Sequence, residues 1–183
     1  MKYNKSIILK DGRECLIRDV TKEDAKEFLH IFTLTHEQTD FLLAYNEDLN
    51  LTVEDEAKYI EARSNTDRAI MFAAIVDGKI VGSAFIEGKD PFTKTKHKAE
   101  LGINIDKDYW RLGIGKALMQ ACIECAKQAK FEQIVLEVIG DNTAAINLYK
   151  AFGFVEYGRN PKGFKSKYSG WQEEVLMYLD LEA

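Results

Sequence analysis

Two glycines separated by one residue, Gly113 and Gly115, lie between a predicted strand and a predicted helix, in the segment YWRLGIGK at 109–116. Glycine lets a backbone come close to a ligand. The unpaired N–H groups at a helix N-terminus, together with the positive end of the helix dipole, favour a phosphate. The segment therefore fits a diphosphate site, and taken alone it fits a tight strand-to-helix turn equally well.

Two other nucleotide-binding motifs do not match this loop. A P-loop requires G-x-x-x-x-G-K-[ST], which the chain lacks. A dinucleotide fingerprint requires a third glycine at position 118, where the chain has Leu118. A nicotinamide-binding domain is therefore disfavoured.

A second motif follows at 142–154 with the sequence NTAAINLYKAFGF. It matches every fixed position of N-x-x-A-x-x-L-Y-x-x-x-G-F, the signature of the GNAT superfamily of N-acetyltransferases, and the strand, loop and helix at 99–129 resemble the central motif of that family. The resemblance covers nearly the whole chain and is greatest to small bacterial members, including the RimJ/RimL-like ones. The loop departs from the family at Trp110, where glutamine or arginine is common, and Arg111 follows one residue later.

The resemblance implies an α/β fold with a mixed, mostly antiparallel sheet of six or seven strands, helices on both faces, and a V-shaped split between two central parallel strands. Acetyl-CoA would bind in this split as co-substrate, and no metal is expected. The implied cofactor-binding positions are backbone groups of Ile103, Asn104 and Ile105, the amides of Leu112, Gly113, Ile114, Gly115 and Lys116, and Asn142 and Asn147 near the pantetheine end.

The implied reaction moves an acetyl group from the thioester to a primary amine of a small molecule or peptide, by direct transfer in a ternary complex. An alkyl amine with a pKa of about 10.4 must lose a proton before it attacks. By the same resemblance, a backbone N–H near Ile105 would stabilise the oxyanion. Tyr149 would give a proton to the leaving thiolate, although its position on the helix also fits a core tyrosine.

Two acids flank the expected split and are candidate catalytic bases. Glu137 lies within the apolar run 134–139, where burial would raise its pKa. Glu100 lies where many relatives have an acid, and we favour it. Either carboxylate also fits a structural ion pair, and water can relay the proton in both cases.

The cysteines and histidines point away from other chemistry. Cys122 and Cys125 form a C-x-x-C but fall on the apolar stripe of a helix predicted at 113–130, which favours core cysteines over a redox pair, a metal site or an acyl-cysteine route. The three histidines have no metal-ligand spacing, and we interpret them as surface residues: His30, His36 and His97.

The segment 35–50 is expected to form part of the acceptor wall. Its acids would attract an ammonium group or simply form a solvated face; they are Glu37, Asp40, Glu47 and Asp48. An aromatic late loop would line the acceptor pocket or a dimer contact, through Phe164, Tyr168 and Trp171. The basic stretches 94–98 and 162–167 fit a CoA phosphate or loop solvation.

The predicted element order is β-α-α-β-β-β-α-β-α-β-β. Asp77-Gly78 between two apolar runs predicts a hairpin, and Thr21 with Asp24 and Thr52 with Asp55 predict two helix starts. The expected strands are 6–9 with 14–18, 69–76, 79–86, 99–105, 133–139, 154–157 and 174–181, and the later helices are 113–130 and 142–152.

Length and composition fit one domain over residues 1–183. The chain is 46% hydrophobic and 30% charged, with a net charge of −5 that disfavours general nucleic-acid binding. The N-terminus lacks an apolar signal-peptide region, and the longest uncharged apolar run, 69–76, is far shorter than the roughly 20 residues of a membrane span. We therefore expect a cytoplasmic enzyme that could form a homodimer. An acyl-CoA-binding sensor with little catalysis is the alternative.

Overall fold

Eight strands of mostly apolar sequence form one continuous sheet in the computed structural model, which describes residues 1–45 and 50–182. The sheet order is β1-β2-β3-β4-β5-β6-β8-β7, and every neighbouring pair is antiparallel except β5 and β6. The strands are β1 (Asn4–Ile8), β2 (Glu14–Asp19), β3 (Ala69–Val76), β4 (Lys79–Gly88), β5 (Lys98–Ile105), β6 (Gln133–Ile139), β7 (Val155–Ser166) and β8 (Gly170–Asp180).

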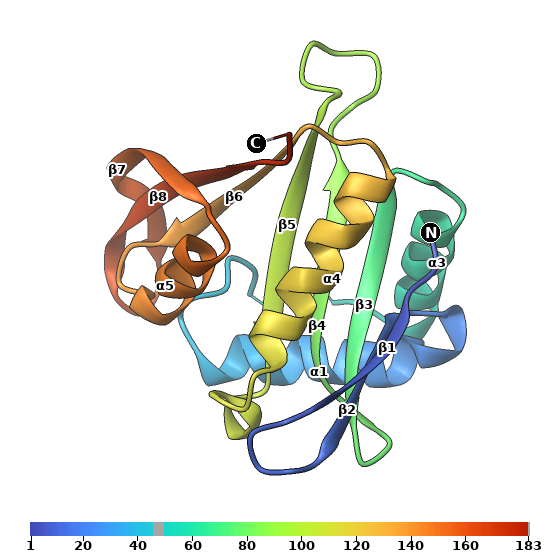
Figure 1. Ribbon diagram of the computed structural model, residues 1–183. Helices are drawn as coiled ribbons and strands as arrows, with labels where there is room; N and C mark the ends of the chain where they lie inside the picture. Colours follow the sequence, from blue (N-terminus) through green and yellow to red (C-terminus); the bar gives the residue numbers. More distant parts are fainter. Residues whose placement is uncertain (46–49, 183) are drawn as a thin grey trace.

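Helices cover both faces of this sheet (Figure 1). The helix α4 (Ile114–Gln128) packs on β4 and β5, while α1 (Ala25–Gln38) and α3 (Val53–Ser64) pack on the opposite face. The remaining helix, α5 (Thr143–Ala151), lies beside β6. None of the described helices is both long and apolar enough to cross a membrane.

The central strands are buried on both faces, which explains their continuous apolar runs. On β3, Phe72 and Ala74 belong to the larger hydrophobic core with α4, whereas Met71 and Ala73 belong to a second core under α1 and α3. Alternate side chains of a strand point to opposite faces, so one apolar run serves both cores. The two layers of helices are thereby fixed on either side of β4 and β5.

Local signals fixed several boundaries as expected. Asp77 and Gly78 both have positive φ, 51° and 76°, which is the backbone of the tight turn predicted between β3 and β4. The Thr52 side chain accepts the Asp55 N–H at 3.1 Å, and the Asp55 carboxylate accepts the Thr52 N–H at 3.1 Å, so α3 begins with a complete capping box.

The two parallel strands part after a short contact. β5 and β6 pair only over Lys98↔Gln133, Ala99↔Ile134 and Glu100↔Val135. Beyond these residues β5 stays paired with β4 as far as Ile105, and β6 stays paired with β8 as far as Ile139. The predicted V-shaped split is therefore present between β5 and β6, and Figure 1 shows the two strands diverging.

Two expectations about the sheet are corrected. It has eight strands rather than six or seven, because β1 and β2 are separate strands of the N-terminal hairpin, and β7 runs through Ser166 instead of ending at Tyr157. The expected late loop is therefore a hairpin of β7 and β8 with irregular pairing at Glu156/Gly158 and Asn160/Phe164. As an edge strand, β7 needs only one partner and tolerates Pro161 and many polar residues, so it shows little apolar pattern.

Candidate active site

The loop before α4 contains backbone amides that have no backbone acceptor in the described structure. Gly113, with φ of 108°, is the N-cap of α4, and no side chain caps this helix end. The Leu112 carbonyl accepts the Lys10 N–H at 3.1 Å, which fastens the loop to the β1–β2 connection. The Lys116 N–H donates to Gly113 at 3.1 Å, so within the described structure the amides of residues 112–115 are the ones without a backbone acceptor.

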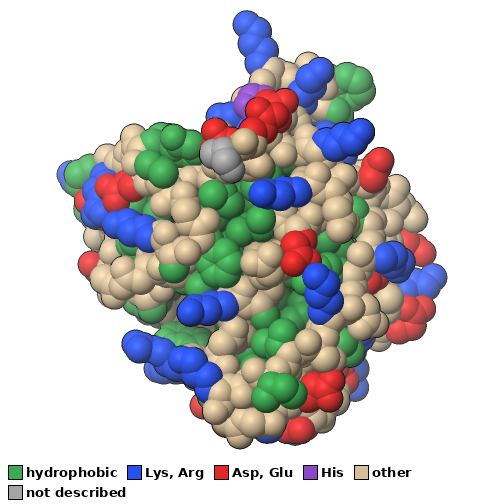
Figure 2. All heavy atoms as spheres, viewed as in Figure 1, with side chains coloured by type: hydrophobic (Ala, Val, Ile, Leu, Met, Phe, Trp, Pro, Cys, Tyr) green, Lys and Arg blue, Asp and Glu red, His purple; other side chains and the backbone are tan. Residues whose placement is uncertain are grey.

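Positive side chains add to this arrangement. In Figure 2, Lys and Arg side chains gather over the loop and the start of α4, next to an apolar seam that separates α4 from the α5 side of the molecule. The helix dipole adds a partial positive charge at the same end. The loop can therefore hold a diphosphate, as its sequence predicts.

Gly115 brings the loop, the split and α5 together. A Cβ at this position would lie 3.2 Å from Leu148 Cδ2 on α5 and 3.4 Å from Ile105 Cδ1 on β5. Glycine therefore permits a close approach that alanine would crowd. The start of α4 thus lies against both the end of the split strand and the helix that carries Tyr149.

Backbone alternation decides which groups of β5 face the split. The Asp106 N–H donates to Val81 on the β4 side at 2.9 Å. In an antiparallel pair, successive residues direct their N–H and C=O groups to opposite sides, so Asn104 faces β4 while Ile103 and Ile105 face the split. The Ile105 carbonyl accepts the indole N–H of Trp110 at 2.8 Å.

Asn104 has a different environment from its two neighbours. Its side-chain amide donates to Thr35 Oγ1 at 2.8 Å, and its carbonyl oxygen accepts the Ser83 hydroxyl. Thr35 is buried and donates to the Ile31 carbonyl at 2.8 Å. This network joins α1 to β4 and β5, which fixes the acceptor side of the split.

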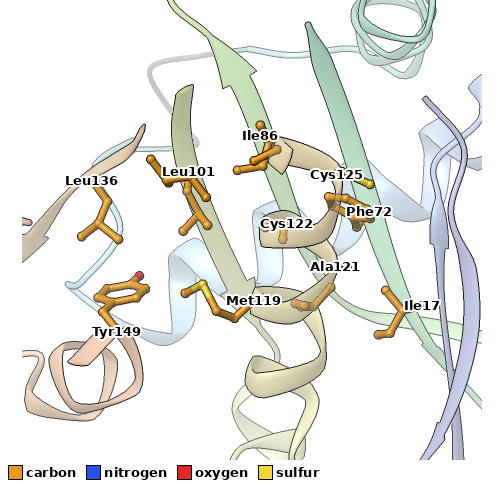
Figure 3. Packing of buried hydrophobic residues seen from close by; sticks show 14 of the residues in the cluster. Ile17, Phe72, Ile86, Leu101, Met119, Ala121, Cys122, Cys125, Leu136 and Tyr149 are labelled. Carbon is orange, nitrogen blue, oxygen red and sulfur yellow. The ribbon is translucent and has the colours of Figure 1, made fainter. Parts of the chain in front are cut away.

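Tyr149 lies beside the split. Figure 3 shows its ring near Leu136 of β6, with the hydroxyl directed toward the space between Leu136 and Leu101 of β5. The residue is 8% exposed, and burial raises its pKa to about 12. No hydrogen bond links the hydroxyl to another residue that the structure describes, so this neutral phenol is a donor facing the split.

The two asparagines implied near the pantetheine end lie on α5. Asn142 is the N-cap, and its Oδ1 accepts the Ala145 N–H at 3.2 Å. Asn147 is exposed. The first side chain therefore positions the helix, while the second is available to a ligand at the surface.

The candidate bases lie on the sheet face opposite α4 and α5. Glu100 is half-exposed and pairs with Lys89. Glu137 is also exposed, whereas its neighbours Leu136 and Val138 point into the core. The deep burial expected for Glu137 is therefore wrong, because strand alternation turns it outward.

The pKa of Glu137 is nevertheless raised. Desolvation is the largest cause, and the charges of Glu174 and Glu100 add to it. The three carboxylates therefore influence one another across β5, β6 and β8. A raised pKa makes this carboxylate a stronger base than an ordinary glutamate.

A cavity of about 540 Å³ lies on this same face, between α1, α3 and the strands β4 and β5. Gly102, Ile103 and Asn104 form its β5 side. Aromatic side chains form much of its wall: Phe28, Phe32, Tyr59 and Phe85. Its polar lining includes His36, Asp55, Glu56 and Ser83.

This cavity differs from the expected acceptor pocket. The late aromatics Phe164, Tyr168 and Trp171 are not among its lining residues, and the segment 35–50 contributes His36 and Leu42. Phe28 and Phe32 are an i,i+4 pair on α1, and Glu56 and Tyr59 are an i,i+3 pair on α3. Phe85 lies on β4, so no local pattern links the three elements.

His36 is half-buried rather than a surface histidine. Its Nδ1 lies 2.7 Å from the Phe32 carbonyl oxygen, and its ring is 4.0 Å from the Phe32 ring. Burial lowers its pKa, so the imidazole is neutral at pH 7.

Asp40 ties the acceptor side to the C-terminal hairpin. Its carboxylate accepts the hydroxyl of Ser166 at 2.8 Å, the hydroxyl of Ser169 at 2.7 Å and the amide of Gln172 at 3.2 Å. These donors replace the ammonium partner considered for Asp40. Glu47 and Asp48, the other acids considered there, lie outside the described residues.

The remaining candidates have structural surroundings. Cys122 and Cys125 are buried in the core as expected, and burial raises both thiol pKa values. Lys162 and Lys165 lie 5.6 and 5.2 Å from the Trp171 ring. The basic stretch 94–98 precedes β5, whose eight residues separate it by roughly 25 Å from the diphosphate loop.

Comparisons with known proteins identify the family of the chain. The model of the Acetyltransferase (GNAT) family matches residues 26–154. An N-alpha-acetyltransferase from Sulfurisphaera tokodaii is 31% identical over 92% of this chain and 94% of its own length. The [ribosomal protein bS18]-alanine N-acetyltransferase of Escherichia coli is 28% identical over 79% of this chain and 94% of its length.

A solved structure gives the same picture. The crystal structure of a GNAT-family acetyltransferase from Streptococcus pneumoniae matches with a TM-score of 0.86 and 29% identity. The match covers 91% of this chain and 99% of that one.

Proposed function

Because the chain belongs to the Acetyltransferase (GNAT) family, we propose that it acetylates the N-terminal α-amino group of a peptide or protein. The chain is an N-acetyltransferase that uses acetyl-CoA as co-substrate. Two relatives support the choice of acceptor by name, one an N-alpha-acetyltransferase and the other a ribosomal-protein-alanine N-acetyltransferase. A small-molecule amine is the other acceptor class.

The observation that carries this proposal is the split between β5 and β6, with the amide loop at one end and Tyr149 beside it. We place the diphosphate on the amides of residues 112–115, because the Lys116 amide already donates to the Gly113 carbonyl. The pantetheine arm pairs with Ile103, whose backbone groups face the split, in the manner of an added strand. Ile105 contributes only its N–H, because Trp110 occupies its carbonyl oxygen. Asn142 and Asn147 remain proposed contacts near that arm.

The acceptor enters from the opposite face, where the aromatic cavity lies. Its ammonium group loses a proton, through water, to Glu137, with Glu100 as the alternative base. Glu137 has the raised pKa and Glu100 is held by Lys89, which favours Glu137. The neutral amine then attacks the thioester directly in the ternary complex, and the Ile105 N–H stabilises the oxyanion.

As the tetrahedral intermediate collapses, the C–S bond breaks near Tyr149, and the attacking nitrogen loses its second proton, through water, to the departing CoA thiolate. A phenol with a pKa of about 12 stays protonated and donates a hydrogen bond to sulfur. Full proton transfer to a thiolate with an ordinary pKa of about 8.5 would be unfavourable. Burial in this apolar space raises the pKa of the CoA thiol, as it does for Cys122 and Cys125. The difference between the pKa values of the phenol and the thiol is therefore smaller.

The test is thiol release from acetyl-CoA with matched peptides that have free or blocked N-termini. We expect turnover only with free N-termini, and mass spectrometry should place the acetyl group on the α-nitrogen. Turnover restricted to free amino acids or polyamines would contradict the peptide acceptor. Tight acetyl-CoA binding without turnover on any amine would instead favour an acyl-CoA sensor.

The proposal also covers domain organisation, oligomeric state and cellular location. The continuous sheet supports a single domain over residues 1–183. Exposed Tyr157, Tyr168 and Trp171 on the C-terminal hairpin offer an apolar surface for a homodimer. A cytoplasmic location fits the use of acetyl-CoA, and light scattering of the purified chain tests the dimer.

A further inference from the structure

The acceptor cavity contains a buried carboxylate that the fold does not use. Glu56, in the first turn of α3, lines the cavity and is 7% exposed. Its side chain makes neither a hydrogen bond nor an ion pair with any residue that the structure describes. Its neighbours do have such roles: Glu54 pairs with Lys58 at 3.0 Å, and Asp55 caps the helix.

The cation that acts on Glu56 makes its ion pair with another acid. Arg63 adds a favourable charge to Glu56, but its Nη2 donates to both carboxylate oxygens of Glu87, at 3.0 and 2.7 Å, and its buried Nε has no hydrogen-bond partner in the described structure. The same guanidinium stacks over the Tyr59 ring at 3.5 Å. Burying a carboxylate without a hydrogen-bonded counter-ion costs free energy. A residue of this kind is suited to pair with a cation from a ligand.

The walls around Glu56 suit a cation with an apolar stem. Phe28, Phe32, Tyr59 and Phe85 line the cavity with aromatic surface. Aromatic faces attract ammonium and guanidinium groups and also accept methylene groups. Asp55 also lines the cavity, but its side chain is exposed and accepts the Thr52 hydroxyl at 2.6 Å, and the ring of His36 is neutral, so Glu56 is the buried acid among the described lining residues.

From this arrangement we infer that Glu56 is the counter-ion for a second cationic group on the acceptor, distinct from the amine that is acetylated. This inference rests on the proposed function for the position of the reacting amine. The cavity extends from Gly102, Ile103 and Asn104, next to the split, to Glu56 and Tyr59 on α3. An acceptor with its amine at the first end places a flexible cationic side chain at the second, so the preferred peptides begin with lysine or arginine.

The experiment compares two peptides that differ only in the first residue, lysine or norleucine. Both side chains have four-carbon stems, and only lysine has the ammonium group. The expected kcat/KM, from thiol release with the wild-type chain, is about 10- to 100-fold higher for the lysine peptide, the range expected for a hydrogen bond between charged groups. Mass spectrometry must place the acetyl group on the α-nitrogen.

Two variants test whether Glu56 causes the preference for the lysine peptide. Glu56→Gln should bring the ratio of the two kcat/KM values close to one, mainly by lowering turnover of the lysine peptide. Glu54→Gln removes an exposed charge from the same turn of α3 and should leave the ratio unchanged. Equal use of both peptides by the wild-type chain, or a ratio that survives in Glu56→Gln, would overturn the inference.

A small-molecule pair separates this inference from the proposed function. 1,4-Diaminobutane and butylamine differ by the second amine alone. If no peptide is acetylated but the wild-type chain prefers the diamine and Glu56→Gln does not, the peptide acceptor fails and the role of Glu56 stands. If neither pair shows a preference that depends on Glu56, the role of Glu56 is wrong whichever acceptor is used.

Discussion

The indole N–H of Trp110 donates a 2.8 Å hydrogen bond to the carbonyl oxygen of Ile105. This bond joins the loop before α4 to the end of the strand that borders the split. It also occupies the carbonyl oxygen of Ile105, which would otherwise face the split. A side chain that interrupts the usual loop pattern thus acts as a brace between the two parts of the cofactor site.

Trp110→Phe tests this brace. The ring can still pack, but the hydrogen bond is lost, at a cost of about 1 kcal/mol, or roughly fivefold. We expect acetyl-CoA to bind about fivefold more weakly, measured by calorimetry, with little change in melting temperature. Trp171→Phe, at an exposed tryptophan on the hairpin, is the control. Unchanged affinity in Trp110→Phe would mean that the loop holds its shape without the bond.

Gly115→Ala tests the contact between the loop, β5 and α5. The new Cβ would lie 3.2 Å from Leu148 and 3.4 Å from Ile105, so the start of α4 must move. Alanine gains about 1 kcal/mol in helix propensity, which offsets much of the crowding in overall stability. We therefore expect a nearly unchanged melting temperature and a clear loss of acetyl-CoA affinity. Gly158→Ala, where the Cβ makes an ordinary 3.5 Å contact, should change neither.

Tyr149→Phe tests the proposed donor to the leaving sulfur. The ring remains and only the buried hydroxyl is lost. We expect kcat to fall about 10- to 100-fold while the dissociation constant of acetyl-CoA stays the same. Stability should not fall, because the hydroxyl has no partner in the described structure. The exposed Tyr157→Phe is the matched control, and equal kcat values in both variants would remove Tyr149 from the mechanism.

The acid limb of the pH profile tests Glu137. Its pKa is raised, so kcat/KM should rise with pH through a value above the ordinary 4.5 of a glutamate. Glu174→Gln removes one cause of the shift and should move this limb to lower pH. Glu137→Gln should abolish the limb, whereas Glu100→Gln should keep it. The opposite pattern in the last two variants would return the role of base to Glu100.

Glu56→Gln also has a pH-dependent effect on stability. Burial raises the pKa of Glu56, so the folded chain holds this proton more tightly than the unfolded chain. The wild-type chain therefore loses stability from this group as pH rises through the folded pKa. Urea unfolding should show the glutamine variant gaining on the wild type between pH 4 and pH 7. A difference that does not vary with pH would indicate that Glu56 is not buried in its charged form.

Short sequence motifs predicted much of the proposed cofactor site. Gly113 and Gly115 act through backbone geometry, and the signature around Tyr149 lies on one helix, so short patterns were enough to propose these residues. The cavity was different, because Glu56, Tyr59 and Phe85 meet only after α3 packs on the sheet. Strand alternation also decides that Glu137 faces outward, and an apolar run buried on two faces hides that alternation. The second half of β7 was not predicted, because an edge strand needs little apolar sequence.

The bond between Asp40 and Ser166 spans 126 positions of the chain. Closing so long a loop is slow compared with forming neighbouring contacts, so this contact belongs to the late steps of folding. During synthesis the ribosome must deliver Ser166 before the acceptor side can be completed. The link between the segment after α1 and the C-terminal hairpin is thus made after most of the sheet already exists.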